Sequence, residues 1–326
     1  MPRTFTDLTR HALNGPTMGT RWSALFHMRG DFETVRVHAA MADAVAEVDQ
    51  QMSTWKPQSD LNRLNAACPG EWIVLPEQLM KVLQAGLAIG EASCGAFDIG
   101  MGDAVAAWGF GAVEADEAAI RAARLARRNS AHDILELDPA NGRARKHADM
   151  RFDLNGIAKG YGVDRLAETA GLHSIEAGLF AIDGELRALG AQPDGSGWAI
   201  AVEKPDLHER APHSIIELED SAIATSGDYR HWVDIGGHRL SHTIDPRLGM
   251  PLRKPPASAT VIARDCMSAD AWATAMMVLG EQEGLKLAEK LSLSVLFLWH
   301  GQPGGTGCGI FANDKRDMRS RKNTAC

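Results

Sequence analysis

The sequence predicts an α+β fold rather than a doubly wound parallel sheet. Strand-like and helical stretches are interspersed along the chain, and several strands are separated only by turn residues, as in hairpins. No internal repeat or long linker divides the 326 residues. This length suits one large domain, or two intimately joined ones, with a substantial core.

The composition is that of an ordinary globular protein and disfavours two functional classes. Hydrophobic residues make up 45% of the chain and charged residues 23%. The 34 basic and 42 acidic residues give a net charge of −8, and no basic stripe is interleaved with aromatic residues. We therefore expect no binding to nucleic acid. No run approaches the roughly 18 consecutive apolar residues that a membrane helix requires, so we expect no transmembrane segment.

The cysteines and the first residues bear on the compartment. Five cysteines are scattered along the chain without a Cys-x-x-Cys pair, so we expect neither a zinc site nor a disulfide framework. Residues 1–15 lack the apolar run of roughly 7–15 residues that a secretory signal requires. The sequence as it stands predicts a cytoplasmic protein, with the periplasm as the alternative.

The N-terminal half is expected to begin with a leader over residues 1–14. A strand over 20–28 follows a turn rich in glycine and proline. An amphipathic helix is predicted over 37–52, because its apolar residues recur at helical spacing. Pro76 opens a second helix, and an alanine- and arginine-rich stretch at 115–128 predicts a helix on the surface.

The C-terminal half is predicted to be richer in strands. One helix begins near Gly156, a second holds Asp270 and Thr274, and a third spans 282–290. The glycine-rich stretch 301–307 is interpreted as a hairpin loop, since no helix follows it as in a phosphate-binding loop. The main domain is placed at 15–312, and a disordered tail is expected at 313–326. Strands are predicted at 179–189, 198–202, 215–218, 259–262 and 293–299.

Asp270 and Thr274 form the most informative pair in the sequence. They stand four residues apart in a helical segment for which Ser268 is the expected N-cap, so both side chains share one face. Their oxygens are of the kind that Mg²⁺ prefers, and a carboxylate on an apolar helix needs a partner. The alternative is an Asp that favours the helix dipole, with Thr274 bonded back to a carbonyl.

The segment 153–161, Asp-Leu-Asn-Gly-Ile-Ala-Lys-Gly-Tyr, favours an anion site. Backbone amides at the start of a helix attract an anion, and Lys159 can reach a phosphate. A surface helix with a stray lysine would leave Gly156 and Gly160 unexplained, because each glycine weakens a helix by about 1 kcal/mol. Close approach of the backbone to a ligand explains them better.

Three further residues stand out, each with more than one interpretation. Trp55 follows a helix end, where it either caps the core or stacks on a ligand. Asp98 lies between apolar neighbours, as a hydrogen-bonded turn residue does. His242 is either a structural histidine or, beside a metal-and-phosphate site, a general base with Asp245 as a possible orienting group.

Taken in order, these segments resemble the ApbE family of Mg²⁺-dependent FAD:protein FMN transferases. The resemblance covers roughly residues 15–311, and seven weak motifs in register make it specific. Two departures are Trp55, where tyrosine is common, and Asp183-Gly184-Glu185, where the family has Gly-Gly-Asp/Glu; no export signal or lipid-anchor cysteine is visible. The motifs are Gly-Pro-Thr-Met-Gly-Thr at 15–20, Met-Ser-Thr-Trp at 52–55, Phe-Asp at 97–98, Asp153 with Ala-Lys-Gly at 158–160, Thr-Ser-Gly-Asp-Tyr at 225–229, Ser-His with Asp-Pro at 241–246, and Ala-Asp with Ala-Thr-Ala at 269–275.

The resemblance implies a fold of the T-fold type, with two subdomains and the flavin in a cleft between them. It also implies a reaction, in which the FMN moiety of FAD moves to a Ser or Thr hydroxyl of an acceptor protein and AMP is released. The implied acceptor carries an Asp-x-x-Ser/Thr-Gly-Ala-Ser/Thr motif and belongs to a redox membrane complex. Carried over by position, FAD would contact Met18, Trp55, Ala96, Phe97, Asp98, Asp153, Lys159 and Ile244, Mg²⁺ would bind Asp270, Thr274 and the carbonyl of Gly156, and His242 would be the base.

Two other functions fit the same residues. With water as the nucleophile, the site would be a metal-dependent FAD pyrophosphatase that yields FMN and AMP. A non-catalytic flavin-binding protein that helps to mature a redox membrane complex is the third possibility. Covalent flavin on an acceptor protein distinguishes the first function from the others.

Overall fold

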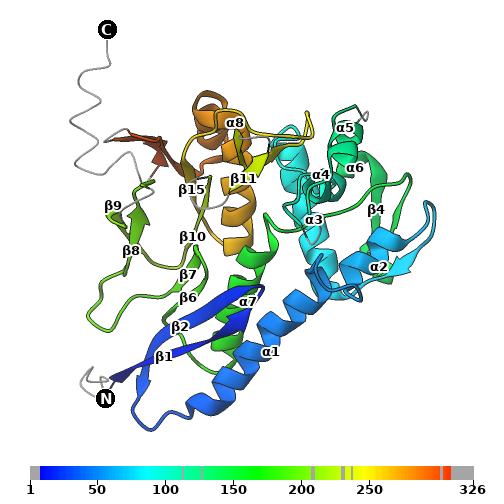
Figure 1. The fold of residues 1–326 in the computed structure, drawn as a ribbon. Coiled ribbons are helices and arrows are strands. Elements are labelled where there is room, and N and C mark those ends of the chain that lie inside the picture. The colour runs from blue at the N-terminus through cyan, green and yellow to red at the C-terminus, as the bar shows by residue number, and fades with distance from the viewer. Residues whose placement is uncertain are drawn as a thin grey trace.

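An eight-stranded antiparallel sheet forms one half of the molecule, and a mainly helical half lies beside it (Figure 1). The structure is a computed structural model that describes residues 8–111, 114–125, 128–206, 210–228, 232–235, 238–301 and 304–309. The mixture of helices with an antiparallel sheet confirms the predicted α+β class.

The large sheet has the strand order β1-β2-β6-β7-β10-β15-β16-β17, and every neighbouring pair is antiparallel. Its strands are β1 Leu8–Thr17, β2 Thr20–Arg29, β6 Gly178–Ile182, β7 Glu185–Leu189, β10 Ala222–Gly227, β15 Ser258–Ala263, β16 Ser294–Leu298 and β17 Gly305–Cys308.

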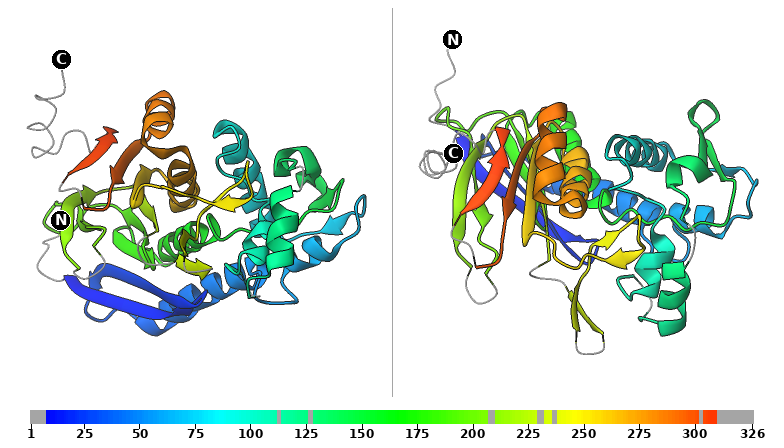
Figure 2. Two further views of the ribbon diagram at one scale, coloured as in Figure 1. Left: turned by 45° about the horizontal axis from the view of Figure 1, so that its top comes forward. Right: turned by 90° about the horizontal axis from the view of Figure 1, so that it is seen from above.

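Helices cover one face of this sheet and a hairpin covers the other (Figure 2). The helical face carries α1 (Thr34–Met52), α7 (Ala158–Leu172) and α8 (Cys266–Leu291). The opposite face carries the hairpin of β8 (Trp198–Glu203) and β9 (Pro212–Leu218). Because side chains alternate along a strand, the sheet can present different chemistry to its two layers.

The helical half includes a small sheet of order β3-β5-β4 at its outer edge (Figure 1). A continuous hydrophobic core joins the two halves, since Leu79 and Leu83 of α3 lie in one cluster with Ala273 and Met276 of α8. The elements of this half are α2 Asp60–Ala66, β3 Ile73–Val74, α3 Glu77–Ala92, α4 Gly102–Ala107, α5 Glu117–Leu125, α6 Ala131–Ile134, β4 Leu135–Asp138, a 3₁₀ turn Pro139–Asn141 and β5 Arg143–Lys146.

Two small hairpins extend from the large sheet, formed by β11 (Trp232–Ile235) with β12 (His238–Ser241) and by β13 (Ile244–Asp245) with β14 (Met250–Pro251). The second hairpin packs on α4, because Ile244 shares a hydrophobic cluster with Trp108, and the Trp108 indole donates to the carbonyl of Gly249 at 3.0 Å. The β13–β14 hairpin, which follows the predicted base His242 in the chain, thus contacts the helical half.

The N-terminal prediction was wrong for residues 8–14. They form most of β1, which pairs with β2 from Leu8 opposite Arg29 to Thr17 opposite Thr20. As the edge strand of the sheet, β1 leaves most of its side chains exposed or half exposed, so it lacks the apolar pattern that marks a buried strand. Residues 1–7 and the predicted tail at 313–326 lie outside the described residues.

The predicted helices are present, with shifted ends. The helix predicted over 37–52 begins at Thr34, Pro76 is the N-cap of α3, and the helix expected near Gly156 begins at Ala158. The surface helix predicted over 115–128 corresponds to α5, described over Glu117–Leu125, and residues 126–127 lie outside the described residues.

The helix that holds Asp270 and Thr274 begins earlier than predicted. Asp265, not Ser268, is its N-cap, and the Asp265 carboxylate accepts from the Ser268 amide at 2.8 Å. The next predicted helix, 282–290, is the second part of α8, separated from the first by non-helical backbone at Gly280.

The strand predictions hold with two corrections. The stretch 179–189 is two strands, β6 and β7, joined by a turn in which Asp183 has a positive φ of 55°. The segment 222–227, for which we predicted no strand, is the strand β10. The strands β16 and β17 are antiparallel partners with Leu298 opposite Gly305, which confirms a hairpin here, but residues 305–307 already belong to β17 and residues 302–303 lie outside the described residues.

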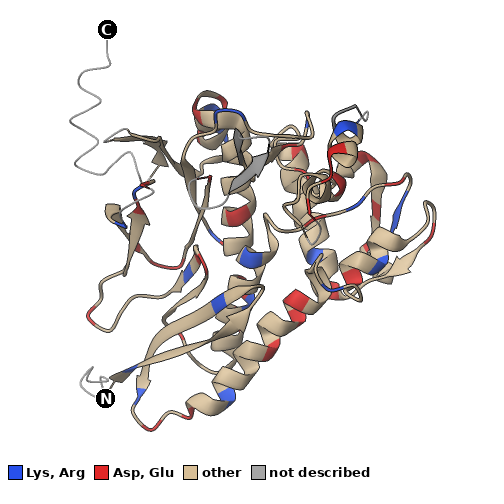
Figure 3. Ribbon diagram, in the orientation of Figure 1, with Lys and Arg blue, Asp and Glu red and all other residues tan. Residues whose placement is uncertain are grey.

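Charged side chains of both signs are interspersed over the described part of the ribbon (Figure 3). Among the described helices, none combines the length and the apolar character needed to cross a membrane.

Candidate active site

One large cavity between the two halves brings together all twelve predicted site residues. Its volume is about 1980 Å³, which exceeds the roughly 300–1,000 Å³ of a typical small-ligand pocket. The twelve are Met18, Trp55, Ala96, Phe97, Asp98, Asp153, Gly156, Lys159, His242, Ile244, Asp270 and Thr274.

Asp270 is buried where α7 and α8 cross. It is 4% exposed, and its Oδ2 accepts a hydrogen bond from the backbone amide of Gly160 at 2.9 Å. A Cβ atom at residue 160 would lie 2.3 Å from the carbonyl oxygen of Cys266 and 2.7 Å from the Asp270 Cβ. Gly160 is therefore required by the close approach of two helices, and not by a ligand as we predicted.

The crossing is fixed by a second carboxylate. Asp164 of α7 accepts from the backbone amides of Cys266 and Met267, each at 2.9 Å, at the first turn of α8. Its Oδ1 also accepts from Arg187 of β7 at 2.7 Å. These bonds hold the start of α8, and so Asp270, in a fixed position relative to Lys159.

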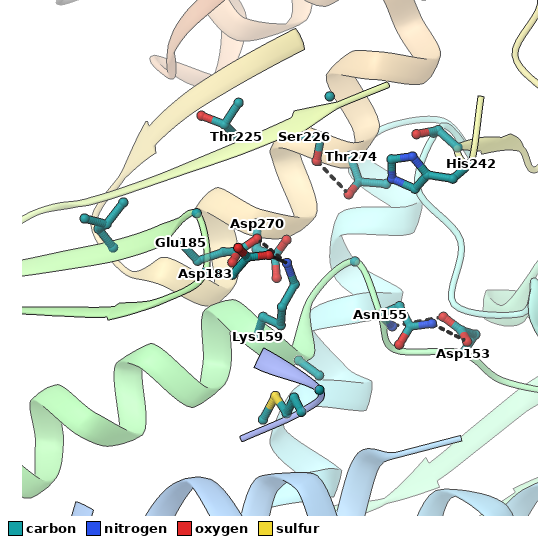
Figure 4. A pocket seen from close by; sticks show the side chains of 18 of the residues that line it. Asp153, Asn155, Lys159, Asp183, Glu185, Thr225, Ser226, His242, Asp270 and Thr274 are labelled. Atoms are coloured by element: carbon teal, nitrogen blue, oxygen red, sulfur yellow. Dashed lines mark hydrogen bonds and ion pairs between the residues drawn. The ribbon is translucent and has the colours of Figure 1, made fainter. Parts of the chain in front are cut away.

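Lys159 lies among carboxylates, as Figure 4 shows. Its Nζ is 2.8 Å from Glu185 Oε1 and 3.5 Å from Asp183 Oδ2. Burial acts to lower the pKa of Lys159, but Glu185, Asp270 and Asp183 outweigh it, so the pKa is raised and the ammonium stays charged. The sequence prediction missed Glu185, for which the only signal was the Asp-Gly-Glu turn.

The local charge favours a cation. Three carboxylates face one ammonium group, and Glu185 Oε2 is buried without a hydrogen-bond partner among the described residues. Burial, together with Glu185, raises the pKa of Asp270 to about 7, while Lys159 opposes the shift. A cation at Asp270 would stabilise the ionised carboxylate that burial disfavours.

Thr274 lies one turn beyond Asp270 on α8 and faces the same cavity. Its Oγ1 is 3.2 Å from Ser226 Oγ on β10 (Figure 4). A Cβ at Gly156 would lie 3.0 Å from the same Thr274 oxygen, so the backbone of Gly156 closely approaches this hydroxyl. The predicted metal-binding residues are therefore neighbours.

This donor set fits Mg²⁺. No group of three or more His, Cys, Asp or Glu side chains in the described residues could hold a metal by itself. Asp270, Thr274 and the Gly156 carbonyl would offer one carboxylate and two neutral oxygens, and Mg²⁺ usually takes one or two carboxylates and completes its shell with water and substrate phosphates.

The flavin-side residues line the other walls of the cavity. Trp55 is 61% exposed there, so the interpretation that it caps the core is wrong. Met18 occupies the tight turn between β1 and β2 with φ of 46°, a conformation that costs free energy for a residue other than glycine.

Two further carboxylates are held by hydrogen bonds. Asp98 accepts from the amides of Gly100 at 2.7 Å and Ala131 at 3.2 Å, which confirms the hydrogen-bonded turn, and burial raises its pKa. Asp153 accepts from the amide of Asn155 at 2.9 Å, and burial raises the pKa of Asp153 to about 6.

His242 also borders the cavity, with its ring edge-on to Phe110 at 6.5 Å between centroids. The suggested orienting group is otherwise engaged, since the Asp245 carboxylate binds the Arg247 guanidinium at 2.8 and 2.9 Å. Tyr229, the last residue of the motif at 225–229, lies outside the described residues.

Comparison with known proteins agrees with this arrangement. The model of the ApbE family matches residues 18–297. The chain belongs to the ApbE family. The match extends from the turn at Met18 to β16, and so includes both halves that border the cavity.

Relatives in the ApbE family carry a consistent name. The chain is 35% identical to the FAD:protein FMN transferase of Vibrio cholerae over 288 residues, which cover 88% of this chain and 86% of that protein. It is 30% identical to the FAD:protein FMN transferase of Escherichia coli K12, over 88% of this chain and 83% of that one.

Solved structures of ApbE proteins share the fold. The flavin transferase ApbE of Vibrio cholerae superposes with a TM-score of 0.81 at 32% identity, over 92% of this chain and 97% of that one. The apo form of the flavinyl transferase ApbE of Pseudomonas stutzeri gives 0.82 at 33% identity, over 94% and 96%. The ApbE-like fold predicted from the sequence is confirmed.

Proposed function

We propose that this ApbE protein is a Mg²⁺-dependent FAD:protein FMN transferase, which attaches FMN through its phosphate to a Ser or Thr hydroxyl of an acceptor protein. The names of its relatives support transfer from FAD to a protein. The observation that carries the metal-dependent chemistry is the convergence of Asp270, Thr274 and Gly156 beside Lys159 in one cavity.

The reaction exchanges one phosphorus–oxygen bond for another. The acceptor hydroxyl oxygen bonds to the phosphorus of the FMN half, the bond from that phosphorus to the bridging oxygen breaks, and AMP leaves with the bridging oxygen. The bound cation would neutralise the phosphate charge that develops.

The residues of the chain have separate roles in this proposal. Asp270 and Thr274 hold the cation, and the Asp270–Gly160 hydrogen bond fixes the carboxylate. Lys159 carries a charged ammonium that leaves Glu185 and Asp183 for the pyrophosphate when FAD binds. His242 takes the proton of the acceptor hydroxyl, because histidine is the side chain most often used as a general base at neutral pH.

The acceptor and the compartment belong to the same proposal. We expect a target segment of the form Asp-x-x-Ser/Thr-Gly-Ala-Ser/Thr in a redox membrane protein subunit. The compartment is proposed as the cytoplasm, with the periplasm as the alternative, and localisation of the tagged protein would distinguish them.

The direct test is to incubate the protein with FAD, Mg²⁺ and a test protein that carries this segment. Mass spectrometry should show the test protein heavier by one FMN, and AMP should appear in equal amount. AMP without protein-bound flavin would instead identify a pyrophosphatase, and binding of FAD with neither product would identify a flavin-binding accessory protein.

A further inference from the structure

The cavity extends beyond the proposed catalytic residues to the other face of the large sheet. On β7, Glu185 faces α7 and binds Lys159, whereas Leu186 packs on the side of the β8–β9 hairpin. On β10, Ser226 bonds to Thr274 of α8, whereas Ile223 packs on the hairpin side. Glu185 and Ser226 point to one face of the sheet, and Leu186 and Ile223 point to the other. All four line the same cavity.

A gap in the sheet joins the two sides. β10 pairs with β7 only at Ala222 and Ile223, although it continues to Gly227. Residues 224–227 pair with β15 along one edge, and no described strand pairs with their other edge. The sheet is therefore open beside Thr274, where the catalytic side meets the hairpin side.

Residues 199–202 of β8 face this opening along an edge with which no described strand pairs. Four consecutive residues, 199–202, border the cavity, although their side chains alternate between exposed and buried. Because side chains alternate between the two faces of a strand, four consecutive lining residues indicate that the cavity meets β8 along its edge. β8 pairs with β9 along its other edge and with no further strand in the described residues.

We propose that β8 is the docking strand for the acceptor protein. An extended segment of the acceptor pairs with the backbone edge of β8 at residues 199–202 and places an apolar side chain against Leu186, Ile200 and Ile223. The segment continues to the gap beside β10, where its Ser or Thr hydroxyl reaches the face of the sheet on which Thr274 and Lys159 lie. This inference rests on the proposed function, since it requires a protein as the second substrate.

Three observations favour this occupant. Asp270 lies inside the cavity and is only 4% exposed, so the acceptor hydroxyl has to enter the cavity, which an extended segment can do. The unpaired amide and carbonyl groups of an edge strand are the usual template for an added peptide strand. None of the twelve predicted FAD, metal and catalytic residues lies on β8, and the surface is continuous with the cavity that holds them.

The test compares two substitutions on one hairpin. Ala201 and Ile215 are opposite each other in the β8–β9 pair, and both are exposed. Only Ala201 borders the cavity. Ala201→Glu should raise the KM for a test protein that carries an Asp-x-x-Ser-Gly-Ala-Thr segment by about tenfold or more, while the Kd for FAD stays within about twofold of wild type. Ile215→Glu should leave both constants within about twofold.

A second measurement does not depend on the effect of a charge. Benzoylphenylalanine introduced at position 201 should photocrosslink to the test protein, and the same group at position 215 should not. An unchanged KM for Ala201→Glu, crosslinking only to a second copy of this chain, or weakened FAD binding would each overturn the proposal.

The outcomes separate this inference from the proposed function. If wild-type protein attaches FMN to the test protein and Ala201→Glu does so equally well, β8 is not the docking strand but the transferase function stands. If the wild-type protein attaches no FMN, the proposed function fails, and β8 docking fails with it.

Discussion

At the scale of single residues, the site keeps a carboxylate where burial disfavours its charge. Asp270 is buried beside Glu185, and its pKa is raised to about 7. Without a cation, the ionised form therefore destabilises the native state, because the unfolded chain has an ordinary carboxyl pKa. We therefore expect the carboxylate at position 270 to lower the stability of the metal-free protein and to be required for metal binding.

Asp270→Asn tests this trade-off. The amide oxygen can still accept from Gly160, but it carries no charge for a cation. We expect Mg²⁺-dependent transfer to be lost, and the metal-free variant to be at least as stable as wild type at pH 8. As the pH falls from above 7 towards about 4, Asp270 takes up its proton more readily in the native state, so the stability gap should close. Enzyme assays and urea unfolding at both pH values would measure this; near-normal transfer by the variant would contradict it.

Trp55 should stack on an aromatic part of FAD. Its ring is 61% exposed at the cavity, so removing it leaves no hole in the core. Trp55→Ala should weaken FAD binding by about 1–3 kcal/mol, by analogy with base stacking on aromatic side chains, whereas Trp55→Tyr should retain most of the affinity. Fluorescence titration measures both, and equal affinity of wild type and the alanine variant would remove Trp55 from the binding site.

His242 should serve the chemical step rather than FAD binding. A base for the acceptor hydroxyl is idle in the FAD complex, so His242→Ala should leave the Kd for FAD nearly unchanged and lower the transfer rate by about 10²–10⁴-fold. Rapid mixing with saturating FAD and acceptor would give the rate. Loss of FAD binding or of the fold would instead make His242 a ligand contact or a structural residue.

The sequence predicted these residues better than their partners. All twelve predicted site residues border one cavity. They could be identified from the sequence because each lies in a short motif whose residue types indicate its chemistry. Glu185 was missed because it contacts Lys159 across 26 positions in the chain, and no local pattern records such a contact. Asp245 was misjudged for the opposite reason: nearness in sequence to His242 suggested a pair, but Arg247 is the partner it has in the structure.

At the scale of elements, periodicity located the helices and missed strands near the site. α1 and α3 carry apolar residues at helical spacing on one buried face. β10 reads Ala-Ile-Ala-Thr-Ser-Gly, and its polar end faces the cavity, so function interrupts the apolar pattern that would have marked a strand. Its neighbours across the sheet come from distant parts of the chain, which local patterns cannot identify.

The crossing of α7 and α8 predicts different outcomes for two glycines of one helix. A Cβ at Gly160 would collide with the Cys266 carbonyl, whereas a Cβ at Gly171 meets no atom within 4 Å. Gly160→Ala should therefore cost about 1–3 kcal/mol of stability and weaken Mg²⁺ binding by displacing Asp270. Gly171→Ala should be neutral or stabilise by about 0.5–1 kcal/mol. Thermal unfolding and Mg²⁺ titration of both variants would check this, and equal behaviour would mean that the helices separate without consequence for the site.

At the scale of the whole molecule, the site draws on both halves. Trp55 and Asp98 belong to the helical half, and Lys159 and Asp270 to the half with the large sheet, yet all four border one cavity. A ligand that contacts both groups binds only when the halves are packed together. Binding should therefore stabilise the fold as a unit.

FAD and Mg²⁺ should accordingly stabilise the protein together more than separately. A ligand at 100 times its Kd adds about 2.7 kcal/mol to the free energy of unfolding, which corresponds to several degrees in Tm for a protein of this size. If the cation links Asp270 and Thr274 to the pyrophosphate, EDTA should reduce the shift that FAD produces. Riboflavin has the same ring system without phosphates, so any shift that it produces should be the same with EDTA and with Mg²⁺. Differential scanning calorimetry with FAD or riboflavin, each with EDTA or with Mg²⁺, would measure these shifts. A Tm shift by FAD that is the same with EDTA and with Mg²⁺ would show that no cation links Asp270 to the phosphates, and Asp270 would then have a purely structural role.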